Sequence, residues 1–122
     1  MPRTGVVFYR EDDGSIPMLE WFDGLPNKAQ DKCRVRIELL KQFGHELRRP
    51  VADFLREGIY ELRVSLQGIN YRMLYFFHGK AVAVLSHGIV KERNVPPKEI
   101  DDAIERKKKF EREPKRHTHQ EV

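Results

Sequence analysis

Apolar residues recur with two different periods in the first third of the chain. The segment 5–10, GVVFYR, is a run of β-branched and aromatic residues that predicts a short strand. Turn residues follow, and Ser15 with Pro17 predicts a short helix that ends near Gly24. The segment 27–43 predicts a longer helix with a buried stripe, because its apolar side chains recur at helical spacing: Ala29, Cys33, Ile37 and Leu40.

The middle of the chain changes to alternating apolar and polar positions. Residues 45–58 are a polar connection interrupted at Pro50. Three strands are then expected at 59–66, 69–77 and 81–90, because the dipeptides QG and HG between them are typical of tight turns. This spacing predicts a meander of three antiparallel strands.

A last helix is expected from Pro97, since proline suits the first helical turn and acidic residues follow it. The predicted order β-α-α-β-β-β-α makes a small α+β domain, with a mostly antiparallel sheet and helices packed on one face. We expect residues 1–112 to form a single domain. The segment 113–122 has almost nothing to bury and is predicted to be a disordered tail.

Composition and charge restrict the class of protein. The chain has 122 residues, of which 39% are hydrophobic, which is enough for one domain with a core. No apolar run approaches the ~20 residues that cross a bilayer, and the first residues lack the apolar stretch of a signal peptide. A single cysteine, Cys33, suits a reducing compartment, so we expect a cytoplasmic protein. The net charge of +4 favours acidic or polyanionic partners.

Two arginines interrupt the predicted meander. If the first hairpin turns at Gln67–Gly68, Arg63 stands directly opposite Arg72. Alternation then places apolar residues on one face of the hairpin and a polar set on the other, namely Glu61, Arg63, Ser65, Asn70 and Arg72. Like charges directly across a ladder repel each other, so the sequence predicts an anionic partner for this arginine pair.

The second hairpin extends this polar face. If it turns at His78–Gly79, then Asn70 faces His87 and Arg72 faces Leu85. Alternation would send Lys91 to the same side near the end of the strand. Several cationic or titratable groups are therefore expected on one surface.

Two interpretations of the arginine pair follow from the residues alone. In the first, Glu61 offsets the repulsion as part of a surface salt-bridge ladder. In the second, Arg63 and Arg72 grip a phosphate, because planar guanidinium groups bind its oxygens bidentately and stabilise the charge that grows as a phosphodiester breaks.

Four motifs resemble those of a known family. They are ELR at 61–63, YR-x-LYF at 71–76, HG-x-x-K at 87–91 and P-x-E-I-x-x-A at 97–103. Together they resemble the RelE/HigB-like toxins, in particular the phage-derived branch of HigB-type toxins, over about residues 5–110.

The resemblance implies a RelE-like fold and the toxin of a type II toxin–antitoxin system. Toxins of this kind are ribosome-dependent endoribonucleases that cut mRNA in the ribosomal A site. The 2′-hydroxyl attacks the adjacent phosphorus, and neither a metal nor a small-molecule cofactor is required. The implied protein partner is a HigA-like antitoxin with a helix-turn-helix fold.

The resemblance also implies roles for individual residues. Arg72 matches the strand arginine that contacts the scissile phosphate, and Arg63 stands where related toxins place a basic catalytic residue. Lys91 or Arg93 resembles the second basic group beyond the last strand, and with Asn70 these residues are expected to bind RNA.

Two positions depart from the RelE pattern. Ile100 lies near the position of a tyrosine that stacks on the base, and Glu61 stands where RelE itself has a lysine. His87 or Glu61 would then have to move the protons, since imidazole titrates near neutral pH.

Two other functions stay open on the residues alone. One is a toxin on the same fold that binds a protein target such as DNA gyrase, and the other is a phage-derived binding module without catalysis. No metal site is predicted, because His117 and His119 have no further ligand nearby in the sequence.

Overall fold

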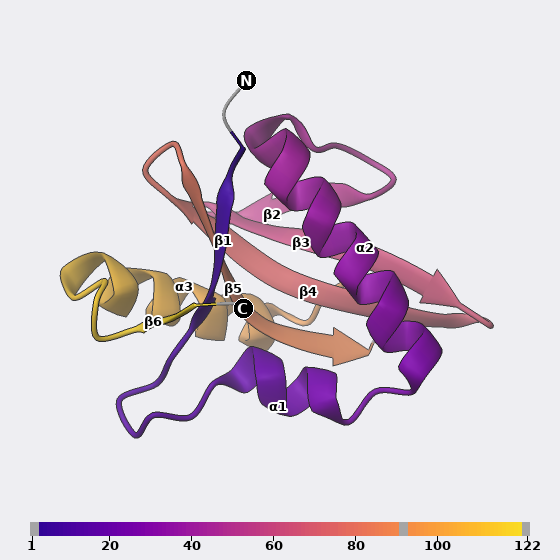
Figure 1. Ribbon diagram of the computed structural model, residues 1–122, viewed down its shortest axis with the longest axis horizontal. Coiled ribbons are helices and arrows are strands. Elements are labelled where there is room, and N and C mark those ends of the chain that lie inside the picture. Colours follow the sequence, from indigo (N-terminus) through magenta and orange to yellow (C-terminus); the bar gives the residue numbers. More distant parts are fainter. Residues whose placement is uncertain (1–2, 91–92, 121–122) are drawn as a thin grey trace.

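The structure, a computed structural model, describes residues 3–90 and 93–120 and confirms the predicted α+β class (Figure 1). Its sheet has six strands in the order β2-β3-β4-β5-β1-β6, antiparallel except where β1 runs parallel to β5. The strands and helices in chain order are β1 (Gly5–Tyr9), α1 (Pro17–Asp23), α2 (Asn27–Phe43), the 3₁₀ turn η1 (Gly44–Glu46), β2 (Ala52–Arg56), β3 (Ile59–Leu66), β4 (Ile69–His78), β5 (Val82–Val90), α3 (Pro97–Arg112) and β6 (Thr118–Gln120).

Helices cover both faces of the sheet rather than one. The first core packs α1 and α2 against alternate strand residues such as Met73 and Tyr75, and α2 crosses in front of the strands in Figure 1. The second core packs α3 against the intervening residues, such as Leu74 and Phe76. The prediction of helices on one face was wrong because β4 is buried on both of its faces at residues 73–76, where its sequence is a continuous apolar run.

The first hairpin has the predicted register. Arg63 pairs with Arg72 and Ser65 with Asn70. The two-residue turn at Gln67–Gly68 has positive φ at both positions (52° and 79°), which matches the right-handed twist of the flanking strands. The arginine pair therefore lies directly across one ladder.

The second hairpin has a different register, so the predicted pairings are wrong. Its loop spans residues 79–81, and the positive φ of 63° falls on Gly79. This loop, together with a β-bulge farther along β5, places Arg72 opposite Ile89 rather than Leu85. A three-residue loop replaces the predicted two-residue turn, and a change in loop length moves every pairing beyond it.

A β-bulge at Ser86 shifts the register once more. His87 faces Leu74 instead of Asn70, because the ladder gains one residue on β5 at this point. His87 still lies on the same face as the arginine pair, as predicted, but it is covered by α3.

Part of the predicted tail is ordered. Strand β6 pairs antiparallel with β1, and His117 stacks on Tyr9 with ring centroids 5.1 Å apart. His117 is only 3% exposed. The expected disorder does not apply to this stretch, because the exposed edge of β1 supplies hydrogen-bond partners that the tail's own composition does not reveal.

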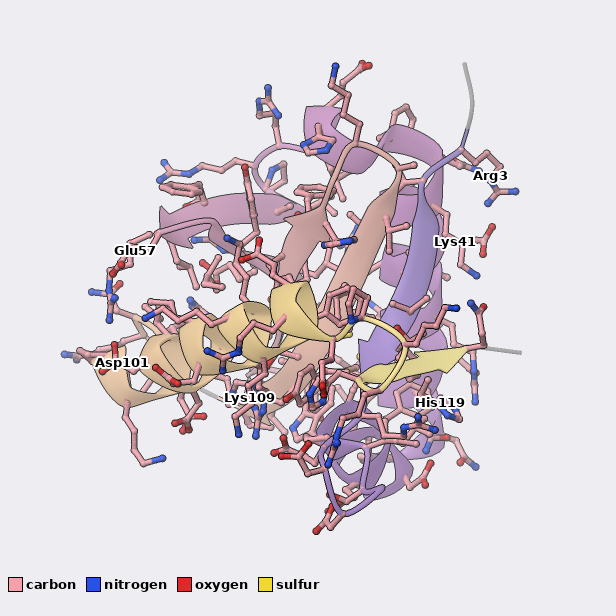
Figure 2. The ribbon with its side chains drawn as sticks, turned by 90° about the vertical axis from the view of Figure 1, so that its left-hand side faces the viewer. Arg3, Lys41, Glu57, Asp101, Lys109 and His119 are labelled. Atoms are coloured by element: carbon pink, nitrogen blue, oxygen red, sulfur yellow. The ribbon has the colours of Figure 1, made fainter. Side chains whose placement is uncertain are left out.

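The polar connection before β3 also contains an unpredicted element, the edge strand β2. Glu57 and Asp101 lie at one end of α3 in Figure 2, and Arg56 pairs with both, at 2.7 and 2.6 Å. This contact joins β2 to α3. Within residues 3–90 and 93–120, no helix is long and apolar enough to cross a membrane.

Candidate functional site

Glu61 joins the two arginines of the pair. Its Oε1 accepts a hydrogen bond from Arg72 Nη1 at 2.9 Å, and its Oε2 accepts one from Arg63 Nη2 at 3.2 Å. Glu61 is 1% exposed, so its carboxylate needs these cationic partners. The interpretation in which Glu61 offsets the repulsion is thus confirmed as a contact, although the carboxylate is buried and not on the surface.

The carboxylate does not use all the donors of the arginine pair. The Nε atoms of Arg63 and Arg72 are buried and have no hydrogen-bond partner among the described residues. A buried donor without a partner costs about 1–3 kcal/mol, so such groups point to a ligand or an ordered water. Both side chains stay partly accessible, 36% exposed for Arg63 and 13% for Arg72.

A second acidic residue comes from the edge strand. Asp53 on β2 faces Glu61 in the ladder, and its Oδ2 lies 3.4 Å from Arg63 Nη2. The same oxygen accepts a hydrogen bond from Arg49 at 3.0 Å. This bond is the main reason that the pKa of Asp53 is lowered, so the group is a carboxylate at neutral pH.

A cleft of about 380 Å³ opens beside the arginine pair, and we call it the arginine cleft. It is lined by Arg36, Pro50, Arg63, Val64, Ser65, Asn70, Tyr71 and Arg72. Arg36 extends from α2, and its Nε donates a hydrogen bond to the backbone oxygen of Arg63 at 3.0 Å. The cleft therefore gathers three arginines and is suited to an anion.

Sequence reasoning missed Arg36 and Asp53. Arg36 follows Cys33 by three residues and precedes Leu40 by four, so its place beside the buried stripe of α2 was a usable signal. Asp53 carried no such signal, because strand β2 was not predicted.

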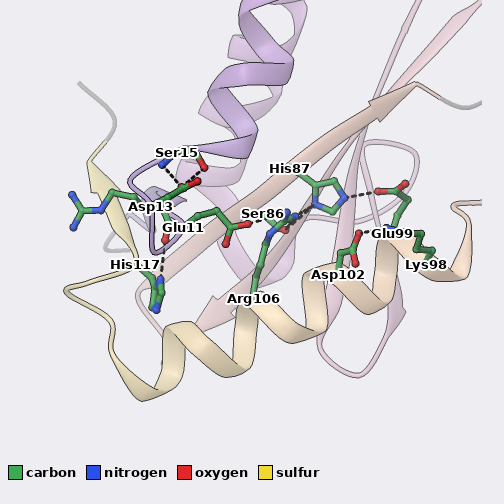
Figure 3. A network of polar contacts seen from close by, with 11 residues as sticks. Glu11, Asp13, Ser15, Ser86, His87, Lys98, Glu99, Asp102, Arg106 and His117 are labelled. Carbon is green, nitrogen blue, oxygen red and sulfur yellow. Dashed lines mark hydrogen bonds and ion pairs between the residues drawn. The ribbon is translucent and has the colours of Figure 1, made fainter.

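His87 is held under α3 and does not line the arginine cleft. Its Nε2 lies 2.9 Å from Glu99 Oε1, and its Nδ1 lies 2.9 Å from Arg106 Nη1 (Figure 3). A guanidinium only donates, so Nδ1 accepts and the ring proton is on Nε2. Burial, and secondly the charge of Arg106, lower the pKa of His87, which favours the neutral ring. Both ring nitrogens are occupied within the protein.

The residues expected to bind RNA are only partly brought together. Asn70 lines the arginine cleft and also a neighbouring cleft of about 590 Å³ that contains Arg93. The Oδ1 atom of Asn70 accepts a hydrogen bond from Ser65 at 2.7 Å, and Arg93 is exposed. Lys91 lies outside the described residues.

Comparison with known proteins places the chain in a family. Residues 20–108 match the family described as phage-derived protein Gp49-like (DUF891). The chain is a Gp49-like protein. Membership in this phage-derived family suggests a toxin-like module. No curated protein matches the chain significantly.

The matched segment of this Gp49-like protein includes the residues of the candidate site described above. Every residue that lines the arginine cleft lies between residues 36 and 72, and Glu99 and Arg106 of α3 also fall within residues 20–108. Among the described residues of the Gp49-like protein, no group of three or more His, Cys, Asp or Glu side chains could hold a metal ion.

Proposed function

We propose that this Gp49-like protein is the toxin of a type II toxin–antitoxin pair and that it cleaves RNA at a phosphodiester bound by Arg63 and Arg72. One observation carries the proposal. Two guanidinium groups oppose each other across β3 and β4 at the arginine cleft, and each has a buried Nε that no described residue satisfies. Donors of this kind match the oxygens of a phosphate.

In the proposed reaction, the 2′-hydroxyl attacks the adjacent phosphorus and the bond from phosphorus to the 5′-oxygen breaks. Negative charge grows on the phosphate oxygens in the transition state, and the arginine pair stabilises it. Arg36 adds a third positive charge from α2.

Glu61 is the better candidate for the base that takes the hydroxyl proton. Its two carboxylate oxygens contact both guanidinium groups, at 3.2 and 2.9 Å, so the carboxylate lies beside the proposed phosphate site, where it can accept the hydroxyl proton. His87 is less suited, because Glu99 and Arg106 occupy its ring nitrogens.

The substrate and partner belong to the same proposal. The resemblance to RelE/HigB-like toxins supports mRNA in the ribosomal A site as the substrate and a HigA-like helix-turn-helix antitoxin as the inhibitor. A basic chain, with a net charge of +4, is suited to a surface rich in RNA phosphates.

The test is induced expression of the wild-type chain and of Arg72→Ala, followed by mapping of mRNA 5′ ends. We expect codon-phased cuts in translated messages for the wild type and their loss in Arg72→Ala. Removing one donor to the transition state costs about 2.7–4 kcal/mol, or roughly 10²–10³-fold in rate. Growth arrest should disappear with the cuts.

Two further variants control for folding. Arg72→Lys keeps a positive charge beside Glu61 but loses the guanidinium fork, so we expect a folded protein with reduced cleavage. Arg34→Ala removes an exposed arginine on α2, where the side chain is 57% exposed, and should cut like the wild type. A folded Arg72→Ala protein that remains fully toxic would remove the proposed role. Trapped DNA breaks with intact messages would instead support a gyrase-binding toxin.

A further inference from the structure

We infer that a second cleft, at the β2 edge of the sheet, binds an unpaired RNA base next to the phosphate at the arginine pair. This aromatic cleft measures about 480 Å³, and the residues of its wall that matter here are His45, Arg48, Arg49, Asp53, Phe54 and Tyr60. The inference rests on the proposed function and specifies how the substrate strand is held.

Phe54 offers an exposed ring in a fixed position. It is 53% exposed, although it belongs to a strand of the sheet. Its ring meets Tyr60 edge-on, with centroids 5.2 Å apart and an angle of 71° between the rings. Tyr60 is itself stacked on Tyr75 at 5.4 Å. An aromatic ring that is held from its edge can present a face to a base.

A second ring, that of His45, also lines the aromatic cleft. His45 in η1 stacks on Phe77 with centroids 3.6 Å apart and an angle of 22° between the rings. His45 is exposed, so one face of the imidazole contacts the protein and the other is accessible. The cleft thus combines two aromatic groups from η1 and β2, segments that are separate in the sequence.

Two exposed arginines give the aromatic cleft a positive rim. Arg48 Nη1 donates a hydrogen bond to the backbone oxygen of His45 at 2.7 Å, which orients its guanidinium. The Arg49 side chain is 75% exposed and pairs with Asp53. Exposed cations beside aromatic rings are the combination with which proteins hold single-stranded nucleic acid.

Ion pairs connect the aromatic cleft to the arginine pair. Oδ2 of Asp53 contacts Arg49 at 3.0 Å and Arg63 at 3.4 Å. Arg63 in turn shares Glu61 with Arg72. The rings of Phe54 and Tyr60 lie on the opposite face of the sheet from the arginine pair, so a strand whose phosphate lies at that pair would pass around the β2 edge at Asp53 to place a neighbouring nucleotide in the aromatic cleft.

An added peptide strand fits this edge less well than a nucleotide. Strand β2 is an edge strand, which is a place where another chain can pair. However, its register shifts between Phe54 and Arg56, and such an irregularity interrupts the regular hydrogen-bond pattern that an added strand requires. Stacking on Phe54 needs no continuous ladder.

The experiment compares the affinity of Phe54 variants for a fluorescein-labelled 2′-O-methyl RNA 20-mer without secondary structure, measured by fluorescence anisotropy at low salt. The methyl group blocks the attacking hydroxyl, so the probe stays intact whether or not the chain is a nuclease. We expect Phe54→Ala to weaken binding about 5- to 150-fold, the range for loss of one base–aromatic stack. Phe54→Trp should bind like the wild type.

Phe43→Ala is the matched control, because Phe43 is a 51% exposed phenylalanine on α2 that does not line the cleft. Its affinity should equal that of the wild type. A duplex of the same RNA should bind more weakly and should not respond to Phe54→Ala, since paired bases cannot stack on the ring.

The inference is overturned if Phe54→Ala binds the probe like Phe43→Ala, if the loss is equal for the duplex, or if the wild type does not bind the probe. Loss of antitoxin binding alone in Phe54→Ala would show a protein surface instead. These results are separate from the mRNA mapping. If mRNA is cut in a way that depends on Arg72 but Phe54→Ala does not change probe binding, the proposed function holds and the further inference fails. If probe binding depends on Phe54 but no mRNA is cut, the RNA-binding cleft holds and the proposed nuclease activity fails.

Discussion

Glu61 is the side chain that holds the two cleft arginines side by side. It is 1% exposed and accepts one hydrogen bond from each guanidinium. A carboxylate in this position is expensive to bury, but without it two like charges would oppose each other across the ladder. At the residue scale, Glu61 therefore serves the stability of the fold as well as the arrangement of the site.

Glu61→Gln should lower the free energy of unfolding by about 3 kcal/mol, because it leaves both guanidinium groups without their shared counter-charge. Urea denaturation measures the change. Inorganic phosphate should stabilise Glu61→Gln more than the wild type, since an anion can replace the lost carboxylate. Glu57→Gln is the control, because the Glu57 side chain is 65% exposed and a surface ion pair contributes only about 0–1 kcal/mol. A Glu61→Gln protein as stable as the wild type would contradict this account.

At the scale of elements, Gly88 allows helix α1 to pack on the sheet. A Cβ atom built on Gly88 would overlap Cε3 and Cδ2 of the Trp21 ring. Trp21 also meets Tyr71 edge-on, at 6.4 Å between centroids. The glycine of the HG-x-x-K motif thus has a packing role, since it admits an indole ring close to the backbone of β5.

We predict that Gly88→Ala lowers the free energy of unfolding by about 1–3 kcal/mol, the usual cost of overpacking a well-filled core. The chain has one tryptophan, so displacement of Trp21 should also shift its fluorescence emission. Gly24→Ala is the matched control, because Gly24 has a right-handed φ of −84° and its nearest neighbour lies 3.6 Å from the added atom. Unchanged fluorescence emission and unchanged stability in Gly88→Ala would show that the packing of α1 on the sheet does not depend on the contact between Trp21 and Gly88.

At the scale of the whole molecule, one polar network joins α3 to the sheet and to the segment after β1. Arg106 contacts Glu11 at 3.4 Å and His87 at 2.9 Å, and His87 contacts Glu99 (Figure 3). The pKa of His87 is lowered below its ordinary value of 6.5 by burial and by the charge of Arg106. The unfolded chain therefore binds a proton at His87 at a pH at which the folded chain does not.

Stability should consequently fall as the pH drops below 6.5, because protons favour the unfolded state in this window. The contribution of one such group is at most about 1.4 kcal/mol per pH unit. We predict that the free energy of unfolding decreases from about pH 7.5 to about pH 5.5 and that it decreases less in His87→Gln, whose side chain stays neutral.

Urea denaturation at the two pH values measures the difference, and His45→Gln, which removes an exposed imidazole, is the control. An equal decrease in the wild type and in His87→Gln would show that another group carries the pH dependence.

The sequence by itself determined the α+β class, most of the elements and the position of Arg63 opposite Arg72. These features depend on local information. Side-chain periodicity distinguishes a strand from a helix, and the turn at Gln67–Gly68 sets the register of the hairpin that it closes. The arginine pair was predictable because both residues lie within a few positions of the same turn.

Only the tertiary structure decided what surrounds that pair. Asp53 and Arg36 reach it from separate elements, α3 covers the second face of the sheet, and β6 pairs with β1 at the far edge. His87 lies beside Glu99 because the second hairpin has a longer loop and a bulge, and no local sequence pattern predicted either of them. Contacts of this kind form between segments distant in the chain, where packing and unsatisfied hydrogen bonds select the partners. The periodicity of apolar residues predicts the secondary structure of each segment, but it contains no information about which segments pack against each other.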